Sequence, residues 1–278
     1  RDRSPSRGLG DVYKRQNLGK VYVRKGYRIP EAGRSARGQN IVNIIPTDPG
    51  EKVSAMIAGR GVTEDNYLVF VTRNGTVKRT AQSAFKNIRS NGIRALSLDE
   101  GDELISVLQT TGEDKILLAT HDGMAICFAE TDARAMGRDA VGVRGIRLRE
   151  GDYVVGAGIA AEGAAILSIT ENGYGKRTDV GEYSVQNRGG MGLKNYNVTD
   201  KTGPVADVVI VTGDEDLLVI SDDGTIIRMD VGSISLLSRS TQGVRVMRLT
   251  GDAKVISIAH TVKEDSAEAD SPEAREES

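Results

Sequence analysis

The residues of this sequence best suited to chemistry are arginines placed just before loop glycines. An arginine precedes a glycine by three or four residues at five places along the chain. These arginines are Arg34, Arg89, Arg138, Arg188 and Arg239. A guanidinium group presents a planar fork of N–H donors that fits phosphate oxygens, and a glycine lets the backbone approach a phosphate closely. The spacing therefore predicts a phosphate-binding loop that occurs five times.

Further cations accompany these loops. In four of the five copies a base follows the loop glycine by two residues: Arg94, Arg144, Lys194 and Arg245. Other candidate phosphate contacts in the same stretches are Arg37, Lys78, Arg79, Arg147, Lys176, Arg177 and Arg228. No segment resembles a helix that reads base edges, so we expect contacts with the nucleic-acid backbone and no sequence preference. Aromatic residues make up only 4% of the chain, which disfavours single-stranded binding by base stacking, so double-stranded DNA is the expected partner.

Other chemistry has little support. Two histidines and one cysteine disfavour a histidine-rich metal site and exclude a multi-cysteine one. No paired carboxylates and no Ser–His arrangement stand out, so we expect no catalytic residue, no metal and no cofactor. The chain shows neither a signal-peptide pattern nor an apolar run long enough for a membrane helix, which predicts a cytoplasmic protein without a membrane partner.

Three sets of glycines recur about every 50 residues and stay in register, which indicates tandem repeats. One set marks a turn between two apolar runs: Gly19, Gly75, Gly123, Gly173 and Gly224. A second set is the loop glycines: Gly38, Gly92, Gly142, Gly192 and Gly243. A third set is a Gly-acid pair at Gly50, Gly101, Gly151 and Gly251, which is degenerate at Gly203.

Each repeat is predicted to contain four short strands. Apolar runs such as Tyr67–Val71 suit strands buried on both faces. The Asn-Gly and Asp-Gly pairs that follow predict hairpins in which both central residues have positive φ. Further strands are expected after the loop, at 93–98, 143–148 and 244–249, and after the Gly-acid turn. Four strands in about 50 residues is the size of a propeller blade, so we predict an all-β, propeller-like fold of five repeats with the first truncated.

Charge is segregated within the repeats. Residues 17–262 carry 30 bases and 30 acids. The arcs from each turn glycine to the end of the loop strand (19–46, 75–98, 123–149, 173–199 and 224–249) hold 24 bases and 7 acids, and the other segments hold 6 bases and 23 acids. Equivalent positions of stacked repeats fall on one rim, so the pattern predicts a basic rim for nucleic acid. The alternative is that bases simply solvate outer strands while acids favour turns.

The two ends depart from the repeat. Residues 1–16 (RDRSPSRGLGDVYKRQ) lack the apolar run expected before Gly19, and we interpret them as adapter or vector sequence, with a genuine basic linker as the alternative. Residues 263–278 hold seven acids, two bases and no aromatic residue, which predicts a disordered acidic tail. The repeat domain is therefore expected to span 17–262.

Three segments closely resemble the C-terminal domain of the DNA gyrase A subunit. They are Tyr27–Ile45 (YRIPEAGRSARGQNIVNII), Arg134–Leu148 (RAMGRDAVGVRGIRL) and Glu171–Thr178 (ENGYGKRT). The resemblance implies a β-pinwheel, in which neighbouring blades exchange strands, and a basic edge that wraps duplex DNA in support of ATP-dependent negative supercoiling. It also implies two protein partners, the gyrase A catalytic core in cis and the gyrase B subunit. The catalytic tyrosine of that family belongs to an upstream domain, so this chain by itself is not expected to be an enzyme.

The family's signature box has the form Gln-Arg-Arg-Gly-Gly-Lys-Gly and lies in the first blade. The most similar segment of this chain keeps Gln186, Arg188, Gly189, Gly190 and Gly192, with Asn and Met in place of two bases. It belongs to the fourth repeat, so we interpret it as the box-like loop of a later blade. Since the family usually has six blades, a fragment without the first blade and its box is expected. The alternatives are a protein-binding propeller scaffold, which the absence of Trp disfavours, and the equivalent domain of topoisomerase IV, in its A subunit.

Overall fold

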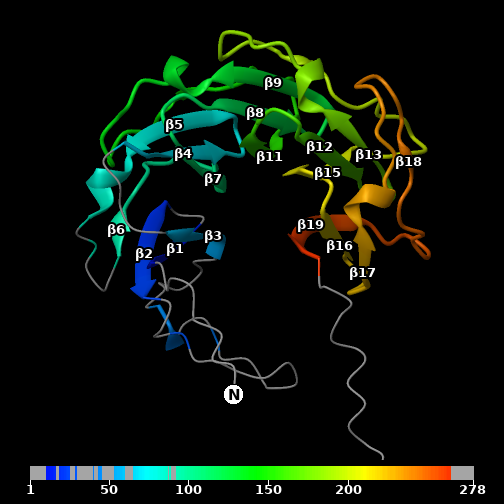
Figure 1. The fold of residues 1–278 in the computed structure, drawn as a ribbon, viewed down its shortest axis with the longest axis horizontal. Coiled ribbons are helices and arrows are strands. Elements are labelled where there is room, and N and C mark those ends of the chain that lie inside the picture. The colour runs from blue at the N-terminus through cyan, green and yellow to red at the C-terminus, as the bar shows by residue number, and fades with distance from the viewer. Residues whose placement is uncertain are drawn as a thin grey trace, which may run out of the picture.

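The computed structural model describes residues 11–16, 19–25, 29, 40, 43–45, 53–59, 65–86, 88 and 92–263. Five small antiparallel sheets follow one another around a ring-like arc, with the first and fifth sheets at its two ends (Figure 1). This confirms the predicted all-β, propeller-like fold of five repeats. In the described part of the chain no helix is long and apolar enough to cross a membrane.

Among the described residues, four sheets have four strands each and the fifth sheet has three. In spatial order, the first sheet contains β3 (Val53–Gly59), β1 (Asp11–Gln16), β2 (Lys20–Lys25) and β6 (Ile93–Arg94). The second contains β7 (Leu104–Thr110), β4 (Tyr67–Thr72), β5 (Thr76–Ala81) and β10 (Val143–Arg144). The third contains β11 (Val154–Ile159), β8 (Lys115–Thr120), β9 (Met124–Ala129) and β14 (Leu193–Lys194). The fourth contains β15 (Val205–Val211), β12 (Ala165–Thr170), β13 (Tyr174–Asp179) and β18 (Val244–Arg245), and the fifth contains β19 (Val255–Val262), β16 (Glu215–Ser221) and β17 (Ile226–Asp230).

Neighbouring repeats exchange strands. The outermost strand of each of the first four sheets comes from the next repeat along the chain, and we call these four, β6, β10, β14 and β18, the exchange strands. Each is two residues long, so the predicted six-residue strands at 93–98, 143–148 and 244–249 are too long. The chain leaves the sheet after two residues because it then crosses the turn of the neighbouring hairpin. For example, the N–H groups of Gly145 and Ile146 both donate to the carbonyl oxygen of Gly75, at 2.8 and 3.3 Å.

The hairpin turns differ from the expected type. In the second sheet the N–H of Gly75 donates to the carbonyl oxygen of Thr72 at 3.0 Å, and Gly75 has φ of +79°. No described residue other than glycine has positive φ, so Asn74 does not, and the prediction of positive φ at both central residues is wrong. The turn thus spans four residues and ends in a left-handed glycine, which is the geometry of a three-residue hairpin loop with a bulge.

The core lies between adjacent sheets. β4, β8 and β12 are buried along almost their whole length, as their continuous apolar runs predicted. β16 instead alternates between buried and half-buried residues, as expected for a sheet at the end of the described series that packs on one face. Cys127 is 2% exposed and unpaired, within the core between the third and fourth sheets.

One turn of 3-10 helix follows the second strand of the later repeats. These turns are η3 (Gln82–Phe85), η4 (Glu130–Asp132), η5 (Val180–Glu182) and η6 (Val231–Ser233). They redirect the chain into the Arg- and Gly-rich loops.

The first sheet includes a segment that the sequence pattern excluded from the repeat. The backbone of Asp11–Gln16 forms β1 between β2 and β3, in the place that β4, β8, β12 and β16 take in the other sheets. Main-chain pairing does not require the apolar side chains that this segment lacks. The prediction that residues 11–16 lie outside the repeat fold is therefore wrong for their backbone. The interpretation of residues 1–16 as adapter or vector sequence stays a prediction. Residues 264–278 of the predicted acidic tail lie outside the described residues.

Candidate nucleic-acid interface

The exchange strands place one cation each on the outer edge of four sheets. Arg94, Arg144, Lys194 and Arg245 are the second residues of β6, β10, β14 and β18, and all four side chains are exposed. Each stands opposite the residue that follows a turn glycine, as Arg144 stands opposite Thr76. In Figure 1 β6 and β18 lie on the outer side of the arc, and β10 and β14 take the same edge position in the strand order of their sheets. Strand exchange therefore gives the four cations equivalent positions.

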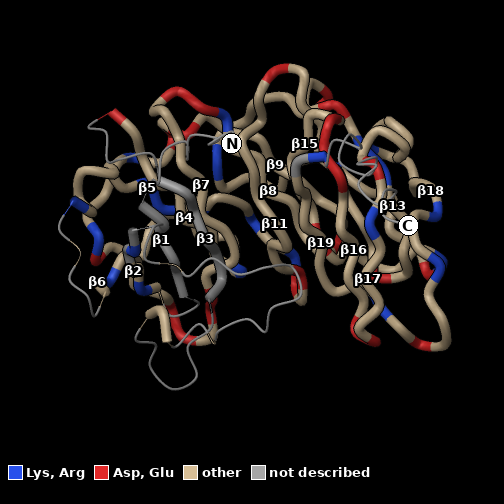
Figure 2. Tube along the Cα trace, turned by 60° about the horizontal axis from the view of Figure 1, so that its bottom comes forward, with Lys and Arg blue, Asp and Glu red and all other residues tan. Residues whose placement is uncertain are grey.

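Charge is arranged around these strands as the sequence predicted. Figure 2 shows Lys and Arg near β2, β6, β13 and β18, while Asp and Glu gather in the connecting turns. Arg147, three residues after Arg144, is also exposed. The described part of the chain holds no group of three or more His, Cys, Asp and Glu placed to bind a metal.

Two of the predicted phosphate contacts are inside the protein. Lys78 and Lys176 are each 0% exposed. The ammonium of Lys78 donates to the carbonyl oxygens of Ala95, at 2.7 Å, and Arg138. Neither cation can reach a phosphate in this conformation, so the prediction that they contact DNA directly is wrong. Both lysines are the third residue after a turn glycine, and the same position holds Ile126 in the third repeat and Ile227 in the fifth. The isoleucines indicate that this position is buried, which a count of charges does not show.

The Lys176 ammonium holds the loop of the next repeat. It donates to the carbonyl oxygens of Ser238 and Arg239, both at 2.7 Å, and to the Oγ1 of Thr241 at 3.2 Å. Burial lowers the pKa of Lys176 to about 8, against the opposing effect of the nearby Glu182 carboxylate. Burial likewise lowers the pKa of Lys78 to about 8. From their buried positions, Lys78 thus holds the loop that carries Arg138, and Lys176 holds the loop that carries Arg239.

Three more predicted contacts are engaged within the protein. The guanidinium of Arg79 lies 3.6 Å from the Glu130 carboxylate, and Arg79 is 9% exposed. Arg177 donates to the carbonyl oxygen of Ile234 at 2.8 Å, which fixes the chain after η6. Arg228 pairs with Asp216 at 2.8 Å across β16 and β17. These side chains follow the turn glycine along the second strand, where sequence reasoning could not separate them from the exchange-strand cations.

The loop arginines bridge adjacent repeats. Arg188 donates to the carbonyl oxygen of Arg144 at 3.0 Å, and Arg239 donates to that of Lys194 at 3.2 Å. Both side chains are half-buried. They therefore hold the backbone of an exchange-strand cation, which is a positioning role that the phosphate-contact prediction had not included. Arg138 is also half-buried, whereas Arg34, Arg37 and Arg89 lie outside the described residues.

The box-like loop Gln186–Gly192 runs beside the preceding exchange strand. The N–H of Gly189 donates to the carbonyl oxygen of Gly145 at 2.6 Å, and Gly189 has φ of +81°. The N–H of Gln186 donates to the carbonyl oxygen of Cys127 at 2.8 Å, and the N–H of Arg147 to that of Gly190 at 2.8 Å. The glycines therefore allow close backbone packing between consecutive loops.

The same backbone link recurs at neighbouring junctions. The N–H of Asn197 donates to the carbonyl oxygen of Thr241 at 3.1 Å, and that of Ser97 to Ala140 at 3.4 Å. The outer loops thus form a connected series, which fixes the spacing of the exchange-strand cations.

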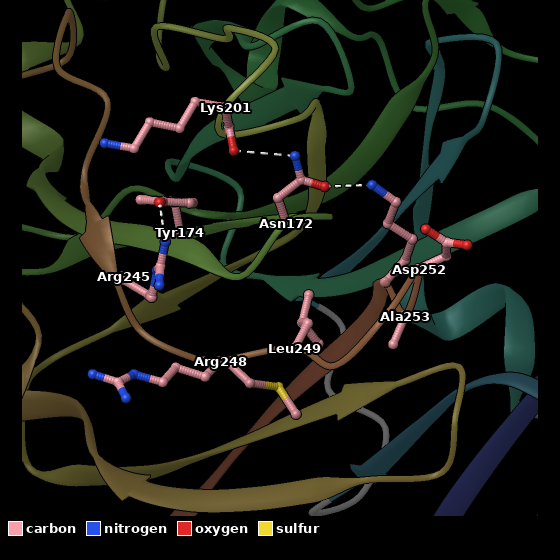
Figure 3. A pocket seen from close by; sticks show the side chains of 11 residues that line it. Asn172, Tyr174, Lys201, Arg245, Arg248, Leu249, Asp252 and Ala253 are labelled. Atoms are coloured by element: carbon pink, nitrogen blue, oxygen red, sulfur yellow. Dashed lines mark hydrogen bonds between the residues drawn. The ribbon is translucent and has the colours of Figure 1, made fainter.

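Sequence reasoning missed a basic pocket between the fourth and fifth sheets. Its volume is about 490 Å³, and Figure 3 shows the side chains that line it. Tyr174, Lys201 and Arg248 belong to it, together with the predicted Arg245. Lys201 escaped notice because it lies in the degenerate Gly-acid turn, in a segment whose charge is otherwise mainly acidic.

Comparison with known proteins identifies the family. A family model described as "DNA gyrase C-terminal domain, beta-propeller" matches residues 17–59, 66–111, 114–161, 165–212 and 215–261. The DNA gyrase A subunit of Staphylococcus aureus strain MRSA252 is 47% identical over 255 residues, which are 91% of this chain and 29% of the relative. The corresponding protein of strain NCTC 8325 is 47% identical over 252 residues, or 90% of this chain and 28% of that protein. The chain thus spans less than a third of the length of these relatives.

Two solved structures share the fold. The C-terminal domain of DNA topoisomerase IV matches with a TM-score of 0.83 and 26% identity, over 94% of this chain and 81% of that one. The DNA gyrase A C-terminal domain matches with a TM-score of 0.79 and 27% identity, over 91% of this chain and 83% of that one. Each of the five matched repeats supplies at least two strands of one sheet, and this chain belongs to the DNA gyrase C-terminal domain family.

Proposed function

We propose that this chain binds duplex DNA along the outer edge of its sheets and bends the duplex around that edge, without sequence preference. The observation that carries the proposal is the placement of Arg94, Arg144, Lys194 and Arg245 at equivalent, exposed positions of four consecutive sheets. Cations repeated at a fixed spacing along a curved edge can neutralise successive phosphates, and those contacts offset the cost of bending, a few kcal/mol per 20–30 base pairs.

In the whole protein this role would serve ATP-dependent negative supercoiling in the bacterial cytoplasm. The chain would act as the C-terminal part of a gyrase A subunit, and its partners would be the catalytic core in cis and the gyrase B subunit. The 47% identity to the Staphylococcus aureus gyrase A subunits supports this assignment. The chain alone would carry out no strand breakage, because the catalytic tyrosine of the family belongs to the upstream domain.

Salt-dependent binding to duplex DNA tests the proposal. If about 8–12 phosphates are neutralised, log K against log[salt] should have a slope near −7 to −11. Affinity for duplexes of unrelated sequence should agree closely at each salt concentration. Absence of binding at low salt, or binding that does not change with salt, would overturn the proposal.

A role in topoisomerase IV is the second candidate, because the C-terminal domain of that enzyme gives a TM-score of 0.83. A chimaera separates the two roles: this chain would replace the matching region of the Staphylococcus aureus gyrase A subunit, which would be assayed with gyrase B and ATP. Negative supercoiling of relaxed plasmid supports the gyrase assignment. Relaxation of supercoiled plasmid without introduction of negative supercoils would favour the topoisomerase IV role.

A further inference from the structure

The pocket between the fourth and fifth sheets has an excess of positive charge. Four cations line it, namely Lys201, Arg245, Arg248 and Lys254, and Asp252 is the sole carboxylate among its lining residues. In Figure 3 the side chains of Lys201 and Arg248 extend toward the same side of the view, and that of Arg245 extends toward the Tyr174 hydroxyl. The pocket therefore favours an anion.

Tyr174 fixes one of these cations. Tyr174 and Arg245 are direct partners in the β13–β18 pair, and the Nη2 of Arg245 donates to the tyrosine hydroxyl at 2.8 Å. The ammonium of Lys201 lies 5.4 Å from the centroid of the same ring. Tyr174 is 8% exposed, so its ring is held by the surrounding protein. The hydrogen bond from Arg245, together with the charge of Lys201, lowers the pKa of the Tyr174 hydroxyl.

Asn172 fixes the opposite wall. Its side-chain amide donates to the carbonyl oxygen of Lys201 at 3.1 Å and accepts a hydrogen bond from the ammonium of Lys254 (Figure 3). The backbone that carries Lys201 is therefore tied to the β12–β13 turn. Within the described part of the chain, the Lys201 ammonium and the Arg248 guanidinium have no carboxylate partner. A pocket whose backbone walls are fixed before binding is preorganised for an anion. Cations without a carboxylate partner are available to pair with that anion.

This arrangement is particular to one junction. The residue opposite the exchange-strand cation is Lys20 in the first sheet, Thr76 in the second, Met124 in the third and Tyr174 in the fourth. Lysine, threonine and methionine supply neither the ring nor the phenolic hydroxyl that align Arg245. Arg245, which lines the pocket, belongs to β18, the exchange strand of the fourth sheet.

We propose that Lys201, Arg248 and Arg245, of which Arg245 is aligned by Tyr174, form a site for one phosphodiester group of bound duplex DNA at the junction of the fourth and fifth sheets. The inference rests on the proposed function and deepens it: it adds Lys201 and Arg248 as phosphate contacts and Tyr174 as a positioning residue. At this junction Arg245 binds DNA through a guanidinium that the tyrosine hydroxyl fixes. Arg188 and Arg239 instead hold the backbone carbonyls of Arg144 and Lys194, and the Lys194 ammonium donates to the Oδ1 of Asn197 at 3.0 Å.

The experiment measures binding of a fluorescent duplex of about 30 base pairs by anisotropy over a range of salt concentrations, for the full chain and its variants. Lys201→Gln and Arg248→Gln should each weaken binding about three- to tenfold and reduce the magnitude of the salt slope by about 0.9. Tyr174→Phe keeps every charge, so it should weaken binding about threefold with an unchanged slope. The matched control is Lys115→Gln, which removes an exposed cation and should change neither quantity. Lys115 stands opposite Ala129, at the other end of β9 from the residues that pair with β14.

The outcomes separate this site from the wider proposal. If the wild-type chain fails to bind the duplex, the proposed function fails. If the wild type binds with the expected slope but Lys201→Gln and Arg248→Gln behave like Lys115→Gln, the phosphodiester site alone is overturned. Pyrophosphate at constant ionic strength is the second probe. Displacement of the duplex by pyrophosphate that Lys201→Gln abolishes is expected, because it means that DNA and pyrophosphate share the pocket. Binding of pyrophosphate that depends on Lys201 but leaves duplex affinity unchanged would instead assign the pocket to a free phosphate ligand and overturn the duplex assignment.

Discussion

The ammonium of Lys176 donates a hydrogen bond of 2.7 Å to the carbonyl oxygen of Arg239. A fully buried cation in the fourth repeat thus holds the backbone of a half-buried cation in the fifth. Arg239 in turn donates to the carbonyl oxygen of Lys194 on an exchange strand. Hydrogen bonds therefore link three cations of the basic arcs, Lys176, Arg239 and Lys194, from the core to the surface. Of the three, only Lys194 is exposed.

Replacing Lys176 with methionine should destabilise the protein by about 1–3 kcal/mol. The substitution keeps the apolar stem but leaves the carbonyl oxygen of Arg239 without its buried donor, which costs about 1–3 kcal/mol for an unsatisfied group. The carbonyl oxygen of Ser238 keeps its bond from the Thr241 hydroxyl at 2.8 Å. Urea unfolding followed by circular dichroism measures the loss. Lys194→Met is the matched control, since an exposed lysine should change the free energy of unfolding by less than about 0.5 kcal/mol. Equal effects would mean that the Lys176 contacts contribute nothing.

The buried lysines should also make stability rise with pH. The pKa of Lys78 and of Lys176 is about 8 in the folded chain and 10.5 in the unfolded chain. Between these two values the unfolded chain binds more protons, so the free energy of unfolding contributed by each lysine increases, by roughly 3 kcal/mol across the window. Below pH 8 both states are protonated and the contribution is constant.

The measurement compares urea unfolding of the wild type and the Lys78→Met/Lys176→Met double variant from pH 7 to pH 10.5. The difference in unfolding free energy, wild type minus variant, should grow with pH. Parallel curves for the two proteins would contradict the assigned pKa values.

The repeat itself could be predicted from sequence because glycine spacing reflects a backbone requirement. Four of the turn glycines stand where φ is positive and where the chain of the next repeat crosses, so a Cβ there would overlap that chain: Gly19, Gly75, Gly123 and Gly173. Which cations reach the surface could not be predicted in the same way. Lys176 and Lys194 look alike in the charge count, but β18, a strand more than 60 residues farther along, pairs with β13 and brings with it the loop that covers Lys176. The residues around Lys176 in the sequence do not reveal that a distant loop buries it. The one indication is the apolar residue at the same position in other repeats.

Reversing the charge of Arg144 should weaken duplex binding by about tenfold or more. Arg144→Glu removes one phosphate contact and adds repulsion, and the magnitude of the salt slope should fall by about 1. Lys115→Glu makes the same charge change outside the arcs and should have little effect. Lys254 is not a clean control, because it lines the same pocket as Arg245. Equal losses for Arg144→Glu and Lys115→Glu would show that binding follows net charge rather than the outer edge.

Two turn glycines allow the contribution of strand exchange to stability to be isolated. Gly123 and Gly224 have similar backbone angles, with φ of +78° and +84°. A Cβ on Gly123 would lie 2.8 Å from the carbonyl oxygen of Tyr196 in the crossing chain, whereas a Cβ on Gly224 would meet nothing within 4 Å. Gly224→Ala should therefore cost only the left-handed strain of about 1–2 kcal/mol, and Gly123→Ala should cost about 1–3 kcal/mol more through overlap with the crossing chain. Urea unfolding of the two variants measures the difference. Equal losses would mean that the crossing segment yields freely, and that its contact with the turn contributes little to holding the exchange strand in place.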